Sequence, residues 1–238
     1  MPHYDERMNG TSARGGVQRQ VLADHVYEVL LESLVDGRLE AGASVNIDAL
    51  SRELEVSQTP IREALARLEA TGLVHRLALK GYRVAPLFTA EDLAHLTDAR
   101  LLIEPENAFL ACQRMTDGLI AELRRSIDDL RAPTGPTFAD FRDYWEADER
   151  FHGLIAEATG NPFLLAAYRS LGGQVQRFRL FAGLGVTDAE YAIAEHTAIV
   201  EAFVARDPVA ARAAMAAHIG GVRLRSMQES REREGAEA

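Results

Sequence analysis

The sequence predicts a mainly α-helical protein with two domains, an N-terminal winged helix-turn-helix and a C-terminal antiparallel bundle of six helices. Two observations support this fold class. Short helical patterns followed by two short apolar runs occupy the N-terminal third, and long segments rich in Ala and Leu, without strand signal, follow it. We expect the domains at residues 19–86 and 90–228. Residues 1–18 lack apolar periodicity and are expected to form a mobile arm.

The overall composition is typical of a globular protein with one or two domains. Of 238 residues, 47% are hydrophobic and 26% are charged. No apolar run is long enough to span a bilayer, and no signal peptide is visible at the start. The single cysteine, Cys112, excludes an internal disulfide. We therefore expect a cytoplasmic protein without a membrane partner.

Charge is distributed unevenly along the chain. The formal net charge of −10 argues at first against nucleic-acid binding. Residues 57–85 nevertheless carry five cations and two acids, whereas residues 86–238 carry sixteen cations and twenty-four acids. A locally basic segment on an acidic body suits a protein that binds DNA at one end, although a solvated charged face would give the same pattern.

The segment SQTPIREALARLEATGL, residues 57–73, predicts a recognition helix. Its apolar side chains recur at helical spacing and form a stripe for a small core: Ile61, Ala64, Leu65 and Leu68. Gln58 and Arg62 lie one turn apart on another face. Ser57 can cap the first turn, and Gly72 ends the helix. A short helix that shows polar and cationic side chains fits the major groove of DNA.

The surrounding segments complete a winged helix-turn-helix. Helices are expected at residues 19–36 and 47–53, before the recognition helix. Two short strands are expected at residues 73–74 and 82–84, joined by a tight loop. The tip of this hairpin would place two cations near phosphates or the minor groove, Lys80 and Arg83.

After residue 90 the chain predicts helices only. Glycine- and proline-rich breaks separate long amphipathic segments. Helices connected in this way form an antiparallel bundle. They are expected at residues 90–113, 117–131, 137–159, 162–183, 187–206 and 207–229.

Four ionisable residues of the bundle suggest a metal site. Asp148 and His152 are four residues apart, so they share one face of a helix, and His196 and His218 lie among apolar neighbours on two later helices. Buried ionisable groups are costly unless they are paired or bound to a metal. One carboxylate and three imidazoles suit a divalent ion, zinc foremost and otherwise nickel or manganese. Alternatively, each histidine is a core residue with an ordinary partner, since the spacing does not show that the four meet.

The N-terminal segment GRLEAGASVNIDALSRELEVSQTPIREALARLEATGLVHRLALKGYRVA resembles the DNA-binding domain of the GntR family of bacterial transcription regulators. The resemblance covers roughly residues 19–86. It implies that the DNA-contacting positions are Arg52, Thr59, Arg62 and the wing at Lys80 and Gly81. The alternative for each cation is an ordinary surface side chain.

Three positions depart from the usual pattern of that family. Ala41 stands where proline is usual, Glu55 stands where glycine is usual in the turn, and Gln58 stands where arginine is common. Because Gln58 occupies a DNA-contacting position, its identity bears on operator preference more than on DNA binding itself.

The bundle resembles the C-terminal ligand-binding (FCD) domain of the FadR-like branch of these regulators. Six helices without an extra leading helix suggest the VanR-type subgroup. In that domain an Asp-x-x-x-His pair and two later histidines bind a metal, which implies Asp148, His152, His196 and His218 as ligands. Arg100, four residues before Glu104, would face the cavity and grip a carboxylate effector with two hydrogen bonds. The alternative for this pair is a surface salt bridge worth under about 1 kcal/mol.

Together these features predict a ligand-responsive, DNA-binding transcription regulator, and the resemblance implies that it is a repressor. It would bind a near-palindromic operator as a homodimer, and its C-terminal domain would bind a divalent metal and a small organic acid. One alternative is a metal-dependent hydrolase with a DNA-targeting domain, in which Glu149 or Glu195 would be the general base. Both glutamates adjoin proposed ligands in sequence, but we expect them to point elsewhere on their helices. Another is a purely structural DNA-binding dimer. Because no nucleophile motif or phosphate-binding loop is present, we expect no enzyme.

Overall fold

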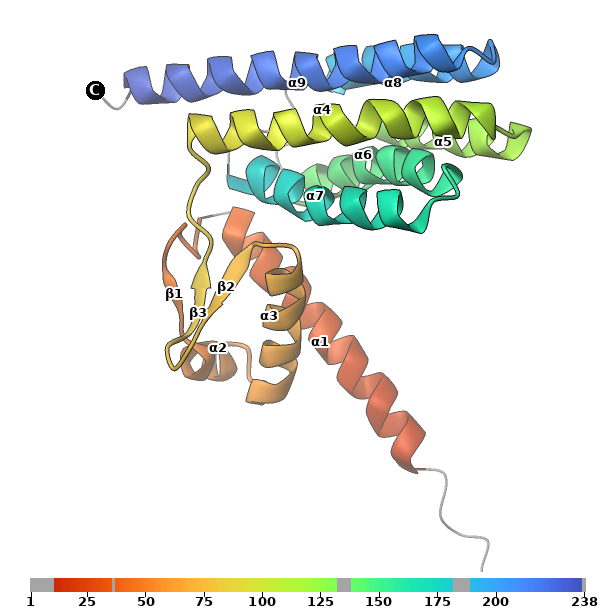
Figure 1. Ribbon diagram of the computed structural model, residues 1–238. Helices are drawn as coiled ribbons and strands as arrows, with labels where there is room; N and C mark the ends of the chain where they lie inside the picture. The colour runs from red at the N-terminus through yellow and green to blue at the C-terminus, as the bar shows by residue number, and fades with distance from the viewer. Residues whose placement is uncertain (1–10, 36, 132–137, 182–188, 237–238) are drawn as a thin grey trace, which may run out of the picture. The chain divides into compact units, whose positions relative to one another are not determined.

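The computed structural model of the protein describes residues 11–35, 37–131, 138–181 and 189–236. The chain divides into two compact units, Met1–Ala85 and Pro86–Ala238. The predicted fold class is confirmed, since the first unit is a small winged helix-turn-helix and the second is helical (Figure 1). Among the described residues, no helix has both the length and the apolar character needed to cross a membrane.

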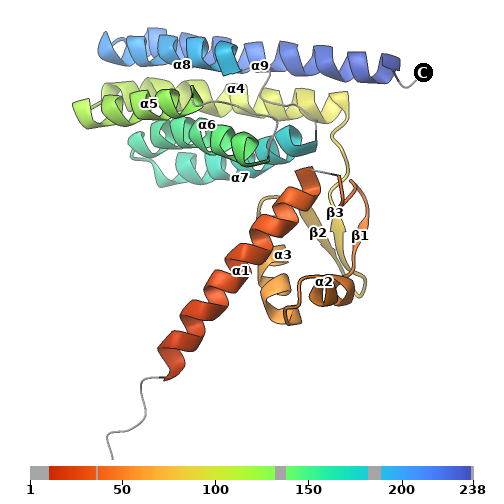
Figure 2. The ribbon, with the colours of Figure 1, turned by 180° about the vertical axis from the view of Figure 1, so that it is seen from behind.

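The first unit packs three helices beside a small antiparallel sheet with the strand order β1-β3-β2 (Figure 2). Helix α1 packs against α3, and their shared core is fully buried at Leu30, Ile61, Leu65 and Leu68. The elements are α1 (Thr11–Val35), β1 (Ser44–Val45), α2 (Ile47–Glu53), α3 (Gln58–Ala70), β2 (Val74–Leu77) and β3 (Gly81–Val84).

This unit differs from the sequence-based expectation in two elements. Strand β1 was not predicted, because two residues are too few to show the alternation of apolar and polar side chains that is typical of a strand. It pairs with β3 through Ser44–Arg83 and Val45–Tyr82. Helix α1 begins at Thr11, so residues 11–18 are helical and not part of an arm. Once a helix is nucleated, each added residue gains a backbone hydrogen bond, which favours this extension despite two glycines. Residues 1–10 lie outside the described residues.

The cap of the recognition helix also differs. Ser57 occupies the N-cap position of α3 with an extended backbone, but its side chain makes no capping hydrogen bond. The cap that does form in this motif is on α2, where Asn46 accepts a hydrogen bond from the backbone N–H of Ala49 at 3.0 Å.

The second unit contains the six predicted helices, with their ends shifted by a few residues. Helix α4 lies between α9 on one side and α6 and α7 on the other (Figures 1 and 2). It begins with a capping box formed by Thr89 and Asp92. The helices are α4 (Ala90–Gln113), α5 (Asp117–Leu130), α6 (Phe138–Ala158), α7 (Pro162–Phe181), α8 (Ala189–Val204) and α9 (Pro208–Ala236).

Candidate metal centre and DNA-binding surface

Three histidines from three helices meet inside the bundle. One ring nitrogen from each of His152 (α6), His196 (α8) and His218 (α9) lies within 4.8 Å of the other two. Asp148, one turn before His152 on α6, places Oδ1 at 3.6 Å from Nε2 of His196. All four residues are at most 4% exposed. The structure therefore brings together the four ligands proposed from the sequence.

The histidine cluster is embedded in an apolar core. The ring of Phe151 stacks on His196 with centroids 4.0 Å apart and planes 3° from parallel. Ile155, Ile199 and Ile219, each within three residues of one of the histidines, are almost completely buried in the surrounding core. Such surroundings exclude water, so charged or polar groups placed there need partners.

Glu104 on α4 contacts the first histidine. Its Oε2 lies 2.6 Å from Nδ1 of His152. Arg100, one turn earlier on α4, donates from Nε to Oε1 of Glu104 at 2.5 Å and from Nη2 to Oε2 at 3.4 Å. Burial acts to raise the pKa of Glu104, but Arg100 and His152 outweigh it and hold this pKa well below its usual range. Glu104 is therefore a buried carboxylate anion, and the Arg100–Glu104 pair is not a surface salt bridge.

Glu195 on α8 likewise contacts a histidine of the cluster, His218. A hydrogen bond of 2.8 Å joins Nδ1 of His218 to Oε2 of Glu195. Arg225 donates to both oxygens of Glu195, at 2.8 and 3.0 Å. Burial opposes ionisation, yet the bonds from His218 and Arg225 lower the pKa of Glu195 to about 2. Burial lowers the pKa of His218, which favours the neutral imidazole that a metal requires.

The donor set fits a divalent metal. Both carboxylates engage Nδ1, which leaves Nε2 of His152 and His218 as lone-pair donors. Among the described residues these two Nε2 atoms are buried and have no hydrogen-bond partner. Zinc forms bonds of about 2.0–2.2 Å to imidazole and carboxylate, so its ligand atoms lie at most about 4.4 Å apart. A small inward movement of the histidine side chains would satisfy this limit.

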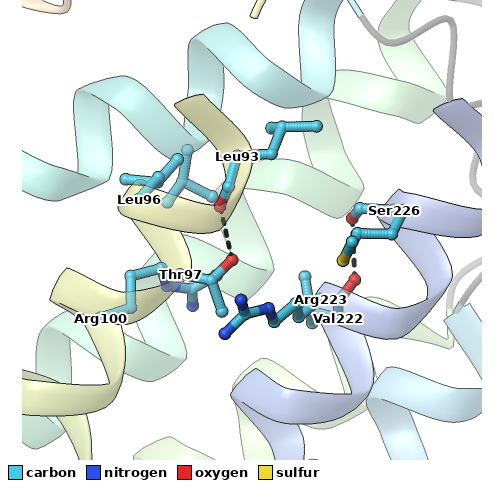
Figure 3. Close-up of a pocket in the computed structure, with 9 residues that line it drawn as sticks. Leu93, Leu96, Thr97, Arg100, Val222, Arg223 and Ser226 are labelled. Atoms are coloured by element: carbon cyan, nitrogen blue, oxygen red, sulfur yellow. Dashed lines mark hydrogen bonds between the residues drawn. The ribbon is translucent and has the colours of Figure 1, made fainter. Parts of the chain in front are cut away.

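A pocket lies beside this centre, between α4, α7 and α9 (Figure 3). Most of its lining is apolar, and Thr97 and Ser226 donate their hydroxyl hydrogens to backbone carbonyls of their own helices. Arg100 lines the pocket and also binds Glu104, so one guanidinium connects the pocket with the histidine cluster. The lining residues are Leu93, Leu96, Thr97, Arg100, Val175, Val222, Arg223, Ser226 and Met227.

In the first unit, every residue proposed to contact DNA is exposed. These residues lie on α2, at the start of α3 and at the tip of the β2–β3 hairpin: Arg52, Gln58, Thr59, Arg62, Lys80 and Gly81. Gln58 donates from Nε2 to Oδ1 of Asp48 at 2.5 Å, and Arg62 donates from Nη2 to Oε1 of Gln58 at 3.3 Å. Gln58 therefore links the two helices of the motif through its amide.

Sequence reasoning missed the role of the carboxylates around the histidines. Glu195 was expected to point away from the ligands, since it directly precedes His196 on the same helix. The structure corrects this expectation. The side chain of Glu195 points from α8 toward α9, where it binds His218 and Arg225. These contacts join residues that are 23 positions apart (Glu195 and His218) and 30 positions apart (Glu195 and Arg225), so no local pattern in the sequence reveals them.

Comparison with known proteins agrees with this architecture. Residues 22–84 match the bacterial regulatory proteins of the gntR family, and residues 95–221 match the FCD domain. The chain is 30% identical to a Paenarthrobacter nicotinovorans protein named "Probable D-xylose utilization operon transcriptional repressor", over 89% of this chain and 91% of that protein. It is 26% identical to the HTH-type transcriptional regulator YcbG of Bacillus subtilis, over 90% and 94% of the two chains.

The fold also matches solved structures. The structure of Escherichia coli McbR/YncC aligns with a TM-score of 0.67 at 20% identity, over 87% of this chain and 97% of that one. The matched families and these relatives are transcription regulators and not enzymes, as predicted. The chain belongs to the GntR family of bacterial transcription regulators and combines its helix-turn-helix domain with a C-terminal FCD domain.

Proposed function

We propose that this regulator is a cytoplasmic, homodimeric repressor whose FCD domain binds a divalent metal and a small carboxylate. The observation that carries the proposal is the buried meeting of His152, His196 and His218 with Asp148 beside them. Without a metal, Nε2 of His152 and Nε2 of His218 would stay buried and unsatisfied among the described residues, which is costly in an apolar core.

These four residues would hold the ion, with zinc foremost and nickel or manganese as alternatives. The ion would supply a fixed positive charge and an open coordination position for an oxygen ligand. Glu104 and Glu195 would hold the imidazoles in the tautomer that directs Nε2 inward. Their own partners, Arg100 and Arg225, would keep both carboxylates ionised.

Arg100 would bind the carboxylate of the effector. A guanidinium has five N–H donors, and Glu104 uses those of Nε and Nη2. A ligand carboxylate at the remaining donors would compete with Glu104 and so change how His152 is held. If the ligand binds one conformation of the FCD domain more tightly than another, it changes the affinity for the operator by at most that difference in binding free energy.

The operator would be read by α3 and the wing. Arg62, Gln58 and Thr59 project from the first turns of α3, the part of a recognition helix that reaches base edges. Arg52 and Lys80, with the backbone at Gly81, would contact phosphates or the minor groove. As a homodimer, the protein would require an operator with two-fold symmetry.

Two measurements test this function together. Metal analysis of the purified, dialysed protein should find about one divalent ion per chain, and the His152→Ala variant should lose it. Fluorescence anisotropy with the promoter region upstream of its own gene should show selective DNA binding. Arg62→Ala should weaken this binding, whereas Arg125→Ala, at an exposed position of α5, should not. A protein that neither retains metal nor distinguishes this fragment from random DNA contradicts the proposal.

A further inference from the structure

The turn at the tip of the β2–β3 hairpin presents a leucine to solvent. Leu79 is 107% exposed, so water surrounds its side chain. The backbone N–H of Lys80 donates to the carbonyl of Leu77 at 3.0 Å, which closes a four-residue turn with Leu79 in its third position. Leu79 has a φ of 63°, a conformation that favours glycine or asparagine at that position. The hairpin therefore holds an apolar side chain in water, on a backbone that disfavours it.

The charges around Leu79 indicate what it could contact. A single exposed leucine is common on protein surfaces and needs no explanation by itself. This one lies in a segment, residues 74–85, that contains no acidic residue. Three exposed cations belong to the same segment: Arg76, Lys80 and Arg83. An apolar tip among cations suits a surface that is anionic at its edges and less polar between them.

The tip lies at the end of the first unit where the proposed base contacts also lie. Helix α3 ends at Ala70 and β2 begins at Val74, so the hairpin runs back toward the start of α3 (Figures 1 and 2). Gln58 and Arg62 are exposed on the first turns of that helix. When a recognition helix occupies the major groove, a neighbouring segment of the same domain can reach the adjacent minor groove. Phosphates line both edges of this groove, and proteins insert leucine and other apolar side chains into it.

We propose that Leu79 is a DNA-contacting residue whose apolar side chain inserts into the minor groove of the operator. This inference rests on the proposed function, in which α3 and the wing bind operator DNA. Lys80 and the two arginines of the hairpin contact phosphates and hold the tip over the groove. Leu79 displaces water from the sugars and base edges, a contact that depends on the width of the groove and on how easily the base pairs there deform. The wing thereby reads the shape of the DNA in addition to its charge.

The variant Leu79→Gly separates this role from a structural one. Glycine fits the left-handed turn, so the midpoint of urea unfolding should rise. The same change removes the side chain, so affinity for the promoter region upstream of the protein's own gene should fall about 10-fold. Stability and DNA affinity should thus change in opposite directions. Leu102→Ala, at an 81% exposed position of α4, is the control and should bind this DNA as the wild type does.

The salt dependence of binding distinguishes an apolar contact from an ionic one. Leu79→Gly should weaken binding at every salt concentration without changing the slope of log affinity against log salt. Lys80→Ala should reduce the magnitude of that slope by about 1, because one phosphate contact is lost. Fluorescence anisotropy with the promoter fragment at several salt concentrations measures both slopes.

A modified DNA fragment tests which groove Leu79 enters. The same promoter fragment prepared with diaminopurine in place of adenine carries an additional amino group in the minor groove, whereas its major-groove groups are unchanged. The wild type should bind this fragment about 10-fold more weakly than the unmodified one. Leu79→Gly should lose much less affinity, because the side chain that meets the added group is absent.

The outcomes separate this inference from the proposed function. A wild type that does not distinguish the unmodified promoter fragment from random DNA overturns the proposed function as well. Selective binding that Leu79→Gly retains in full, or an equal loss by both proteins on the modified fragment, overturns this inference alone. Wild-type sedimentation with phosphatidylglycerol vesicles that Leu79→Gly abolishes, together with unaltered DNA binding, assigns the tip to a membrane surface and also overturns it.

Discussion

Oε2 of Glu104 lies 2.6 Å from Nδ1 of His152, and this contact joins helix α4 to the candidate metal centre on α6. The hydrogen bond between Glu195 and His218 repeats the arrangement on the opposite pair of helices, α8 and α9. In each case an arginine binds both oxygens of the carboxylate. Two of the proposed ligands are thus held by Arg–Glu pairs, so metal affinity should depend on residues that do not touch the ion.

The first prediction concerns Glu104. Replacing it with glutamine removes the anion that holds Nδ1 of His152, and it should weaken zinc binding about 10- to 100-fold. It also leaves Arg100 as a buried charge without its partner, which should lower the free energy of unfolding by roughly 3 kcal/mol. Competition with a chromophoric chelator measures the first effect, and urea unfolding measures the second.

Glu106→Gln is the matched control for this variant. Glu106 lies two residues further along α4, where it pairs with Arg212 at a half-exposed position. Its loss should leave zinc affinity unchanged and alter stability by no more than about 1 kcal/mol. A Glu104→Gln protein with wild-type zinc affinity would show that the contact with His152 does not support the metal site.

The second prediction concerns acid. The folded-state pKa of Glu195, about 2, is below its ordinary value of 4.5, so its carboxylate stabilises the folded state fully above pH 4.5. That stabilisation is lost as the pH falls from 4.5 toward 2, with a slope of at most about 1.4 kcal/mol per pH unit. In Glu195→Gln this part of the pH dependence should disappear. Urea unfolding of the metal-free protein at several pH values between 5 and 3 measures it.

Glu201→Gln, at an exposed position on the same helix, is the control and should retain the wild-type slope. Equal slopes for the wild type and Glu195→Gln would show that the bonds from His218 and Arg225 do not favour the ionised carboxylate in solution.

Much of the fold could be predicted because its signals are local. The apolar stripe of α3 and the glycine and proline breaks between the later helices depend on residues within one or two turns of each other. The i, i+4 spacing of Asp148 and His152 likewise placed both on one face of α6. Strand β1 escaped prediction because its only evidence is its pairing with β3.

The surroundings of the histidines could not be predicted in the same way. Glu104 and His152 are 48 positions apart, and Glu195 and Arg225 are 30 apart, so only the packing of the bundle brings them together. The burial of Asn107 is equally non-local, since it depends on the helices that pack around α4. A sequence pattern can propose ligands, but the groups that orient them become visible only in three dimensions.

The third prediction concerns Gln58. Its amide connects Asp48 on α2 with Arg62 on α3, so Gln58→Ala should release the Arg62 side chain. Affinity for the operator should fall about 3- to 10-fold, whereas affinity for random DNA should change little, because phosphate contacts remain. Anisotropy titrations with both DNA fragments at fixed salt make this comparison. Equal losses for operator and random DNA would indicate that Gln58 does not contribute to specificity.

The fourth prediction concerns the turn between α2 and α3. Glu55 has a φ of 53°, a left-handed conformation that a side chain disfavours and glycine adopts readily. Hydrogen bonds between Ser51 and Val56 on either side of it hold the turn in this shape. Glu55→Gly should therefore raise the free energy of unfolding of the helix-turn-helix unit by about 1 kcal/mol. By contrast, Glu53→Gly, at the last residue of α2, should lower it by up to about 1 kcal/mol. Urea unfolding followed by circular dichroism measures both, and a Glu55→Gly variant less stable than the wild type would show that the strain at this turn is compensated by the glutamate side chain.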